Sequence, residues 1–218
     1  MPDGRLFIGT RRYSSWSLRG WLAVRMAGLD VEEVVIPLRG GNTPDVLALP
    51  SRQVPYLEHR GSQVWESIAI AEYCAEQRPG LWPASAAARA FARTISAEMH
   101  AGFRALRLAL PMNLGREGRP AALAPEVEGD IARVEHLWAE ARGRFGADGS
   151  FLFGPAFTLA DAMYAPVVTR FLSYAAPISP EARAYCDAVR VHPLVTEWYA
   201  DAAAEPESWQ QDKYEQLA

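Results

Sequence analysis

Hydroxyl and carboxyl side chains gather at three places in the first third of the sequence. The first place is the segment YSSWSLR at 13–19, where Ser14 or Ser15 suits the N-cap of a helix. The start of a helix presents free N–H groups and a partial positive charge, which together stabilise an anion such as a thiolate. The segment therefore indicates activation of a thiol, unless the serines serve only to cap the helix.

The second place is the segment QVPYL at 53–57, in which Pro55 directly precedes an expected strand. A cis bond between Val54 and Pro55 would turn the Val54 N–H and C=O outward. These groups would then pair with a peptide-like ligand as one further strand. An ordinary trans proline that enters an edge strand is the alternative interpretation.

The third place is Glu66 and Ser67, at the expected start of a helix. The Ser67 hydroxyl and the free N–H groups of the helix suit a carboxylate, and Glu66 suits an ammonium group. The end of an α-amino acid carries both groups side by side, so the pair predicts a site for it. The alternative is that Glu66 is a first-turn acid that complements the helix dipole and that Ser67 is only a polar filler.

The elements that must position these residues alternate in type. The sequence predicts a strand at 5–9, a helix at 15–27, a strand at 31–37 and mostly loop at 38–53. A hairpin at 56–65 and a helix at 66–77 follow, and helical periodicity continues to the end. This order predicts an α/β thioredoxin-like N-terminal domain (1–80), a linker (81–88) and an all-α C-terminal helical bundle (89–218).

Within the helical part, the apolar residues from Phe91 to Leu110 share one stripe, and a second stripe runs over 127–145. Thr158 with Asp161 three residues later predicts a capped helix over 158–173. Ser179 followed by a proline predicts another helix start. We expect a last helix at 193–204 and a polar tail at 205–218.

Composition limits the classes of function. The chain has 218 residues, a formal net charge of −4, two cysteines and four histidines. No dense basic patch predicts nucleic-acid binding, no apolar run is long enough to cross a bilayer, and the histidines lack metal-ligand spacing. Cys74 and Cys186 form no C-x-x-C motif, so we expect buried thiols in a protein of the reducing cytoplasm, with no metal, nucleic-acid or membrane partner.

The chain resembles the cytosolic glutathione transferases over nearly its full length. The matching segments are YSSWSLR, QVPYL, ESIAIAEY and, later, FG at 153–154 with TLAD at 158–161. The first segment is most similar to serine-type bacterial members and the zeta class. The resemblance implies glutathione as co-substrate and assigns the TLAD segment to helix capping rather than to catalysis.

The resemblance also assigns roles by position. It implies that the Val54 backbone, followed by a cis Pro55, holds the cysteinyl part of glutathione and that Glu66 and Ser67 hold the γ-glutamyl end. Gln53 and Arg39 would lie toward the glycyl carboxylate. The hydroxyl that activates the thiol is left open, in the order of preference Ser14, Ser15 and Tyr13. Arg12 would add positive potential.

The implied activity is attack of the glutathione thiolate on small hydrophobic electrophiles, as in detoxification, by a homodimer. Two alternatives remain: a glutathione-dependent isomerase of the maleylacetoacetate type, and a non-catalytic glutathione- or partner-binding module, because a fold does not fix an activity. The electrophile pocket is expected between the domains, although the same side chains suit an ordinary bundle core. Its candidate residues are Met99, Phe103, Leu108, Met112 and Tyr164.

Overall fold

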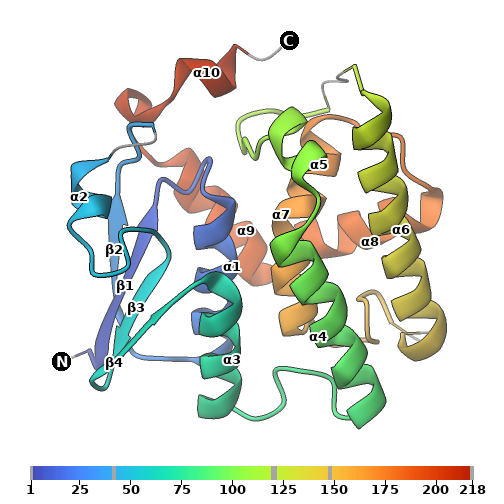
Figure 1. Cartoon of the computed structure of the whole chain (residues 1–218), viewed down its shortest axis with the longest axis horizontal. Helices are drawn as coiled ribbons and strands as arrows, with labels where there is room; N and C mark the ends of the chain where they lie inside the picture. The colour runs from blue at the N-terminus through green and yellow to red at the C-terminus, as the bar shows by residue number, and fades with distance from the viewer. Residues whose placement is uncertain (1, 41–42, 119–121, 147–148, 217–218) are drawn as a thin grey trace.

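The N-terminal part is built on one mixed sheet. The computed structural model describes residues 2–40, 43–118, 122–146 and 149–216 (Figure 1). The sheet has the strand order β2-β1-β3-β4, in which β1 runs parallel to β2 and antiparallel to β3. This topology confirms the predicted thioredoxin-like domain. The strands are β1 (Gly4–Gly9), β2 (Glu32–Ile36), β3 (Tyr56–His59) and β4 (Ser62–Trp65).

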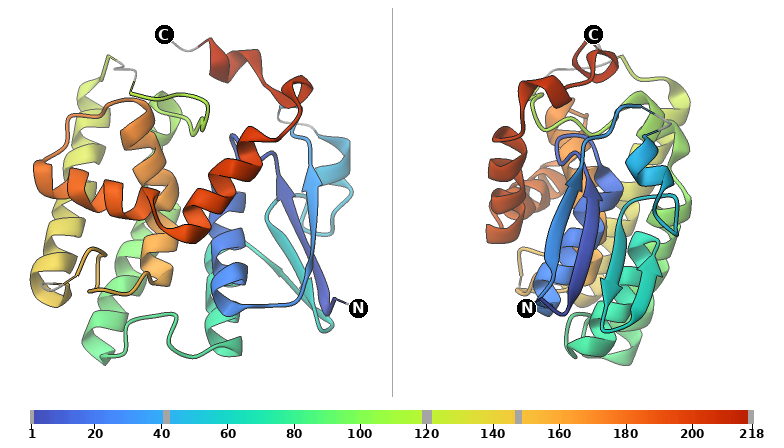
Figure 2. Two further views of the ribbon diagram at one scale, coloured as in Figure 1. Left: turned by 180° about the vertical axis from the view of Figure 1, so that it is seen from behind. Right: turned by 90° about the vertical axis from the view of Figure 1, so that its left-hand side faces the viewer.

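Two helices cover the face of the sheet that looks toward the helical part. These are α1 (Ser15–Ala27) and α3 (Ser67–Gln77), whereas α2 (Pro44–Leu47) lies on the other side (Figure 2). The helix α2 falls in a region that was predicted to be mostly loop. Proline at its first position has the φ angle that a helix needs, so one short turn forms there.

The C-terminal part consists of helices, as predicted. Its central helix α7 is buried along nearly its whole length and begins with the predicted capping box of Thr158 and Asp161. No helix in the described part of the chain is long and apolar enough to cross a membrane. The helices are α4 (Ala86–Ala101), α5 (Arg104–Ala109), α6 (Pro125–Phe145), α7 (Leu159–Ser173), α8 (Pro180–Arg190), α9 (Pro193–Ala203), the 3₁₀ turn η1 (Glu207–Trp209) and α10 (Asp212–Glu215).

Two details differ from the sequence-based expectations. The apolar stripe from Phe91 to Leu110 is not one helix, because α4 ends at Ala101 and Phe103, just before α5, takes a left-handed backbone with φ 56°. In addition, α4 begins at Ala86, inside the predicted linker, because the Ser85 hydroxyl caps it by accepting from the Ala88 N–H. A regular hydrophobic period does not reveal a short interruption of this kind.

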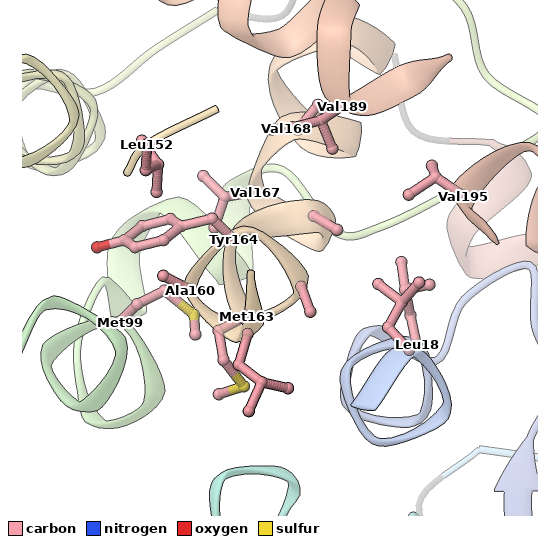
Figure 3. Close-up of a cluster of buried hydrophobic side chains, with 14 of the residues drawn as sticks. Leu18, Met99, Leu152, Ala160, Met163, Tyr164, Val167, Val168, Val189 and Val195 are labelled. Atoms are coloured by element: carbon pink, nitrogen blue, oxygen red, sulfur yellow. The ribbon is translucent and has the colours of Figure 1, made fainter. Parts of the chain in front are cut away.

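The hydrophobic core runs through both parts without a break. Helix α1 packs against α7 and α9, and Leu18 of α1 shares this core with Met163 and Val195 (Figure 3). The rings of Trp21 and Trp198 lie 5.3 Å apart across the same contact. The first turn of α1 is therefore fixed at the junction of sheet and bundle. Cys74 and Cys186 are buried free thiols, as predicted.

Candidate functional site

The three chemistry-bearing segments meet around one carboxylate. The Gln53 side-chain amide donates to Glu66 Oε1 over 2.8 Å, which links the QVPYL segment to the start of α3. On the other side, His100 Nε2 of α4 lies 3.4 Å from Glu66 Oε2. The His100 ring also contacts the ring of Trp16, with centroids 5.0 Å apart, and so connects α3 to the first turn of α1.

The segment before β3 has the cis proline geometry, one of the two interpretations considered from the sequence. The peptide bond between Val54 and Pro55 is cis. Gly20 of α1 lets the proline ring approach closely, because a Cβ at Gly20 would lie 2.8 Å from Pro55 Cγ. No hydrogen bond joins the Val54 N–H or C=O to any residue that the structure describes. These two groups are therefore available to a ligand.

The start of α3 carries a buried polar atom without a partner. Ser67 is 1% exposed, and its Oγ has no hydrogen bond within the described residues. The preceding Glu66 has a left-handed backbone with φ 67°, a conformation that costs energy for a non-glycine residue and is concentrated at functional sites. Most buried polar atoms in proteins are hydrogen-bonded, so the free Ser67 Oγ needs an explanation.

The two serines at the start of α1 differ in their partners. Ser14 Oγ donates to Ser17 Oγ over 2.7 Å, and the Ser17 Oγ also accepts from the Gly9 N–H. Ser15 Oγ instead accepts a hydrogen bond of 3.2 Å from Arg170 Nη2 of α7. The proton of the Ser15 hydroxyl has no acceptor among the described residues, so this hydroxyl is the better placed of the two to donate to a ligand.

Arginines that the sequence did not single out surround Ser15. Arg19 is 0% exposed and Arg170 is 4% exposed. Arg19 Nε donates to the Met163 C=O over 2.7 Å, and Arg170 Nη1 donates to the Pro166 C=O over 3.0 Å. In the described part of the chain, neither guanidinium lies in an ion pair with a carboxylate.

A third arginine, Arg107 of α5, belongs to the same cluster. Its guanidinium carbon lies 4.7 Å from the centre of the Trp16 ring, and that of Arg19 lies 4.8 Å from it. Burial lowers the pKa of Arg170 to about 10, with the neighbouring Arg107 as a second cause. Burial also lowers the pKa of Arg19. An arginine retains its proton near neutral pH even so, and the cluster remains positive.

Tyr13 and Arg12 are bound to the end of the chain instead of facing this cluster. The Tyr13 hydroxyl donates to Glu215 and accepts from the Gln211 N–H, and Arg12 Nε lies 2.8 Å from Glu215 Oε1. Burial, followed by the hydrogen bond to Glu215, raises the pKa of Tyr13 to about 12. Glu215 accepts the hydrogen bond of the Tyr13 hydroxyl and neutralises the charge of Arg12. The expectations that Tyr13 donates to a thiol and that Arg12 supplies free positive potential are therefore not supported.

Arg39 lies in a different cavity. Its neighbours are the end of β2 and the C-terminal segment, which enclose about 610 Å³. In the described part of the chain, no hydrogen bond or ion pair joins Arg39 to Gln53 or Glu66. The Arg39 backbone N–H donates to Thr43 Oγ1. The lining residues are Pro37, Leu38, Arg39, Gly40, Ser208, Trp209, Gln210, Gln211 and Lys213.

The side chains expected to form an electrophile pocket are divided between the hydrophobic core and the surface. Met99, Met112 and Tyr164 lie within the hydrophobic core, and the Tyr164 hydroxyl donates to the Ile95 C=O. Phe103 is also buried, whereas Leu108 is 70% exposed. These residues lie on different elements, since α4 ends at Ala101, α5 begins at Arg104 and Tyr164 belongs to α7, so their role in electrophile binding stays a prediction.

Some residues at the site were missed from the sequence. His100 was not assigned to the site from the sequence, where the histidines showed only a lack of metal-ligand spacing, but it contacts both Trp16 and Glu66. Arg170 lies 155 positions after Ser15, so no local pattern could have joined them. Within the described residues, no group of three or more His, Cys, Asp or Glu side chains could hold a metal ion.

Comparisons with known proteins agree with this architecture. The family model "Glutathione S-transferase, N-terminal domain" matches residues 13–77, and "Glutathione S-transferase, C-terminal domain" matches residues 124–211. The chain is 28% identical to maleylacetoacetate isomerase of Rattus norvegicus over 183 residues, which cover 80% of this chain and 81% of that protein. It is 25% identical to glutathione S-transferase L3 of Arabidopsis thaliana over 203 residues, which cover 88% and 78%.

A solved structure has the same fold. The glutathione transferase homolog from Burkholderia, crystallised with bound glutathione, superposes with a TM-score of 0.70 at 21% identity and covers 93% of this chain and 99% of that one. The two family models together span most of the chain, from the turn before α1 to the C-terminal segment. The chain therefore belongs to the cytosolic glutathione S-transferase family.

Proposed function

We propose that the protein binds glutathione across the starts of α1 and α3 and activates its thiol. The observation that carries this proposal is the buried Ser67 Oγ without a partner, beside the free peptide groups of Val54. The γ-glutamyl carboxylate would accept from Ser67 and from the first N–H groups of α3. The Glu66 carboxylate would hold the ammonium group, and Val54 would pair with the cysteinyl backbone.

The remaining contacts follow from the geometry around Glu66. Gln53 donates to this carboxylate, so in this proposal it acts at the γ-glutamyl end by orienting Glu66, and not at the glycyl carboxylate that the resemblance implied. Pro55 would fix the Val54 peptide against α1. Arg39 would attract the glycyl carboxylate at longer range, from the cavity between the end of β2 and the C-terminal segment.

The thiol would lie at the first turn of α1. A free thiol has a pKa of about 8.5, so only about 3% is thiolate at pH 7. Lowering the pKa by about two units requires about 2.7 kcal/mol of preference for the anion. One hydrogen bond to a charged group contributes about 1.5–3 kcal/mol and a helix start about 0.3–2 kcal/mol. These residues can therefore supply the activation, with Ser15 as the preferred donor and Ser14 as the alternative.

The thiolate would attack a small electrophile on the side of the helical domain. Trp16, His100 and Arg107 border the site there and replace the buried side chains first considered. In this proposal the domain of residues 1–80 binds glutathione, residues 81–88 connect the two, and residues 89–218 face the electrophile.

A second candidate is isomerisation of a conjugated acid, in which glutathione adds to a double bond and leaves again. The arginines near Ser15 have no carboxylate partner among the described residues, and such a cluster favours an electrophile that carries an acid group. The likeness to a maleylacetoacetate isomerase points the same way. Turnover of a generic aryl halide compared with a maleylacetone-like acid separates the two reactions, and glutathione binding without either turnover would support a non-catalytic module.

Glutathione binding to a Ser67→Ala variant tests the proposed site. We expect titration calorimetry to show wild-type binding and an affinity at least about tenfold weaker in the variant, because one hydrogen bond to a carboxylate is lost. Ser62→Ala, on the β3–β4 hairpin, is the matched control and should bind as the wild type does. Equal affinities of wild type and Ser67→Ala would refute this placement of the γ-glutamyl end.

We also propose that the protein acts as a homodimer in the cytoplasm, as the family resemblance implies. Light scattering of the purified chain tests the first part, with a mass of about 48 kDa expected from a 24.0 kDa chain. Fractionation of cells that express it tests the second part. A stable monomer that still turns over substrate would show that the site needs no partner.

A further inference from the structure

We propose that Arg170 of α7 is a positioning residue that orients the Ser15 hydroxyl toward the glutathione sulfur and, together with Arg19, stabilises the thiolate. The inference rests on the proposed function and goes further, because it identifies which hydroxyl acts and brings in the helical domain. In this arrangement the bundle supplies part of the machinery that activates the thiol.

The hydrogen bond between Arg170 and Ser15 sets the direction of the hydroxyl. A guanidinium has only donors, so Ser15 Oγ must be the acceptor in the 3.2 Å contact with Arg170 Nη2. The Ser15 proton is then directed away from Arg170 and remains available to a ligand. The Arg170 guanidinium is itself held, since its Nη1 donates to the Pro166 C=O one turn earlier in α7.

The charge of Arg170 is not cancelled by its surroundings. The titratable groups that act on it are Arg107, Tyr174 and Tyr214, and those that act on Arg19 include Arg170, Arg107 and Tyr164. All of these are arginines or tyrosines, and none is an acid. A positive charge buried without a carboxylate is costly, unless an anion completes the site.

Arg19 provides a second contact to the same residue. Its Nη1 lies 3.5 Å from the Ser15 C=O, and its Nη2 lies 2.8 Å from Met99 Sδ, which is only a weak acceptor. Arg170 Nε is buried and has no hydrogen-bond partner within the described residues. Both guanidinium groups thus have unused donor capacity beside the hydroxyl that would meet the thiol.

The proposed step is a proton loss without any redox change. The glutathione S–H bond breaks, its proton passes to solvent, and the electron pair remains on sulfur as the thiolate. The thiolate accepts a hydrogen bond from Ser15 Oγ–H, which in turn accepts from Arg170. A hydroxyl that accepts from a cation is a stronger donor, so the interaction strengthens along the chain of groups.

The test measures the pKa of the bound thiol from its ultraviolet thiolate absorbance across a pH series. We expect Arg170→Gln, which keeps a donor but loses the charge, to raise the bound thiol pKa by about one unit, a tenfold loss of thiolate below that pKa. Arg170→Lys, which keeps the charge, should restore most of the shift. Arg142→Met removes one positive charge from α6 of the same domain, where Arg142 Nη1 donates to the Ser150 C=O, and should leave the thiol pKa unchanged.

Calorimetry with glutathione separates the two levels of the argument. If the wild type does not bind glutathione, the proposed function fails. If Arg170→Gln binds with wild-type affinity and the bound thiol keeps its pKa, the proposed function stands and the role of Arg170 is refuted.

The serine variants keep the inference testable if the Arg170 variants do not fold. Ser15→Ala should raise the thiol pKa more than Ser14→Ala does. An unchanged thiol pKa in Ser15→Ala would overturn the proposal, because Arg170 is inferred to act through that hydroxyl.

Discussion

Two buried helix starts in this protein have opposite hydrogen-bond arrangements. At the start of α7, Asp161 is 0% exposed and its carboxylate accepts four hydrogen bonds. The donors are the Leu152 N–H, the Thr158 N–H, the Thr158 hydroxyl and the Tyr185 hydroxyl. At the start of α3, Ser67 is equally buried, but its Oγ has no partner among the described residues.

This difference separates a structural site from the proposed binding site. Every acceptor of Asp161 is used within the chain, so the start of α7 can hold the fold together but has no capacity for a ligand. The unpaired Ser67 Oγ contributes nothing to the fold, and its burial is a cost that a ligand can relieve. Burial alone therefore does not identify function. Other buried polar atoms, such as Ser96 Oγ, also lack a partner among the described residues, and Ser67 Oγ differs from them in lying at a helix start that is linked to the Val54 segment through Gln53 and Glu66.

Removal of the satisfied carboxylate should have the largest effect. We expect Asp161→Ala to lower the free energy of unfolding by about 3 kcal/mol or more, because four donors lose their acceptor in a buried place. Urea denaturation followed by circular dichroism measures this loss. Asp187→Ala in α8, which removes an exposed acid paired with Arg183, should change stability by less than about 0.5 kcal/mol. Similar values for both variants would contradict the structural role of Asp161.

A smaller effect is expected where α1 meets the cis proline. Gly20→Ala places a Cβ 2.8 Å from Pro55 Cγ, so it should destabilise the protein by about 1–3 kcal/mol and weaken glutathione binding as the Val54 peptide shifts. Gly129→Ala in α6 has open space around the new Cβ and should stabilise by about 0.5–1 kcal/mol. Thermal unfolding and calorimetry check both. If both variants gained stability, the close approach of Gly20 to Pro55 would be disproved.

Ser67→Ala gives the opposite pattern from Asp161→Ala. Among the described residues its hydroxyl has no partner to lose, so we expect the free energy of unfolding to change by less than about 0.5 kcal/mol or to rise slightly. Ligand-free protein in urea is the appropriate measurement, beside the weaker glutathione binding already expected. A loss above about 2 kcal/mol would mean that Ser67 is structural, as Asp161 is.

The smallest effect concerns pH and a satisfied histidine. His59 is buried with Nδ1 2.8 Å from the Tyr73 hydroxyl, and burial lowers its pKa from 6.5. The unfolded chain therefore binds a proton more readily than the folded one, and stability should decrease as the pH falls below about 6.5. We expect His59→Gln, which cannot be protonated, to lose less stability between pH 7.5 and 5 than the wild type. Denaturant midpoints at the two pH values measure this, and equal losses would exclude a role of His59.

Much of the fold could be predicted because its signals are local. The N-cap at Ser14, the left-handed Gly28 and the proline after Ser179 mark the ends of helices through their own backbone preferences. The capping box at Thr158 and Asp161 works in the same way. The interruption between α4 and α5 at Phe103 was missed because the helical spacing of apolar residues continues across it. That spacing does not reveal a single residue with a positive φ angle.

The sequence by itself determined the order of elements, the site segments around Val54, Glu66 and Ser67, and the likeness to glutathione transferases. These depend on neighbours in the chain, whose geometry is set by short-range sterics and hydrogen bonds. Only the tertiary structure decided which hydroxyl is free. Ser15 accepts a hydrogen bond from Arg170 of α7, and the Tyr13 hydroxyl donates to Glu215 and so is not free for a ligand. Both contacts form because packing brings together residues that are more than 150 positions apart.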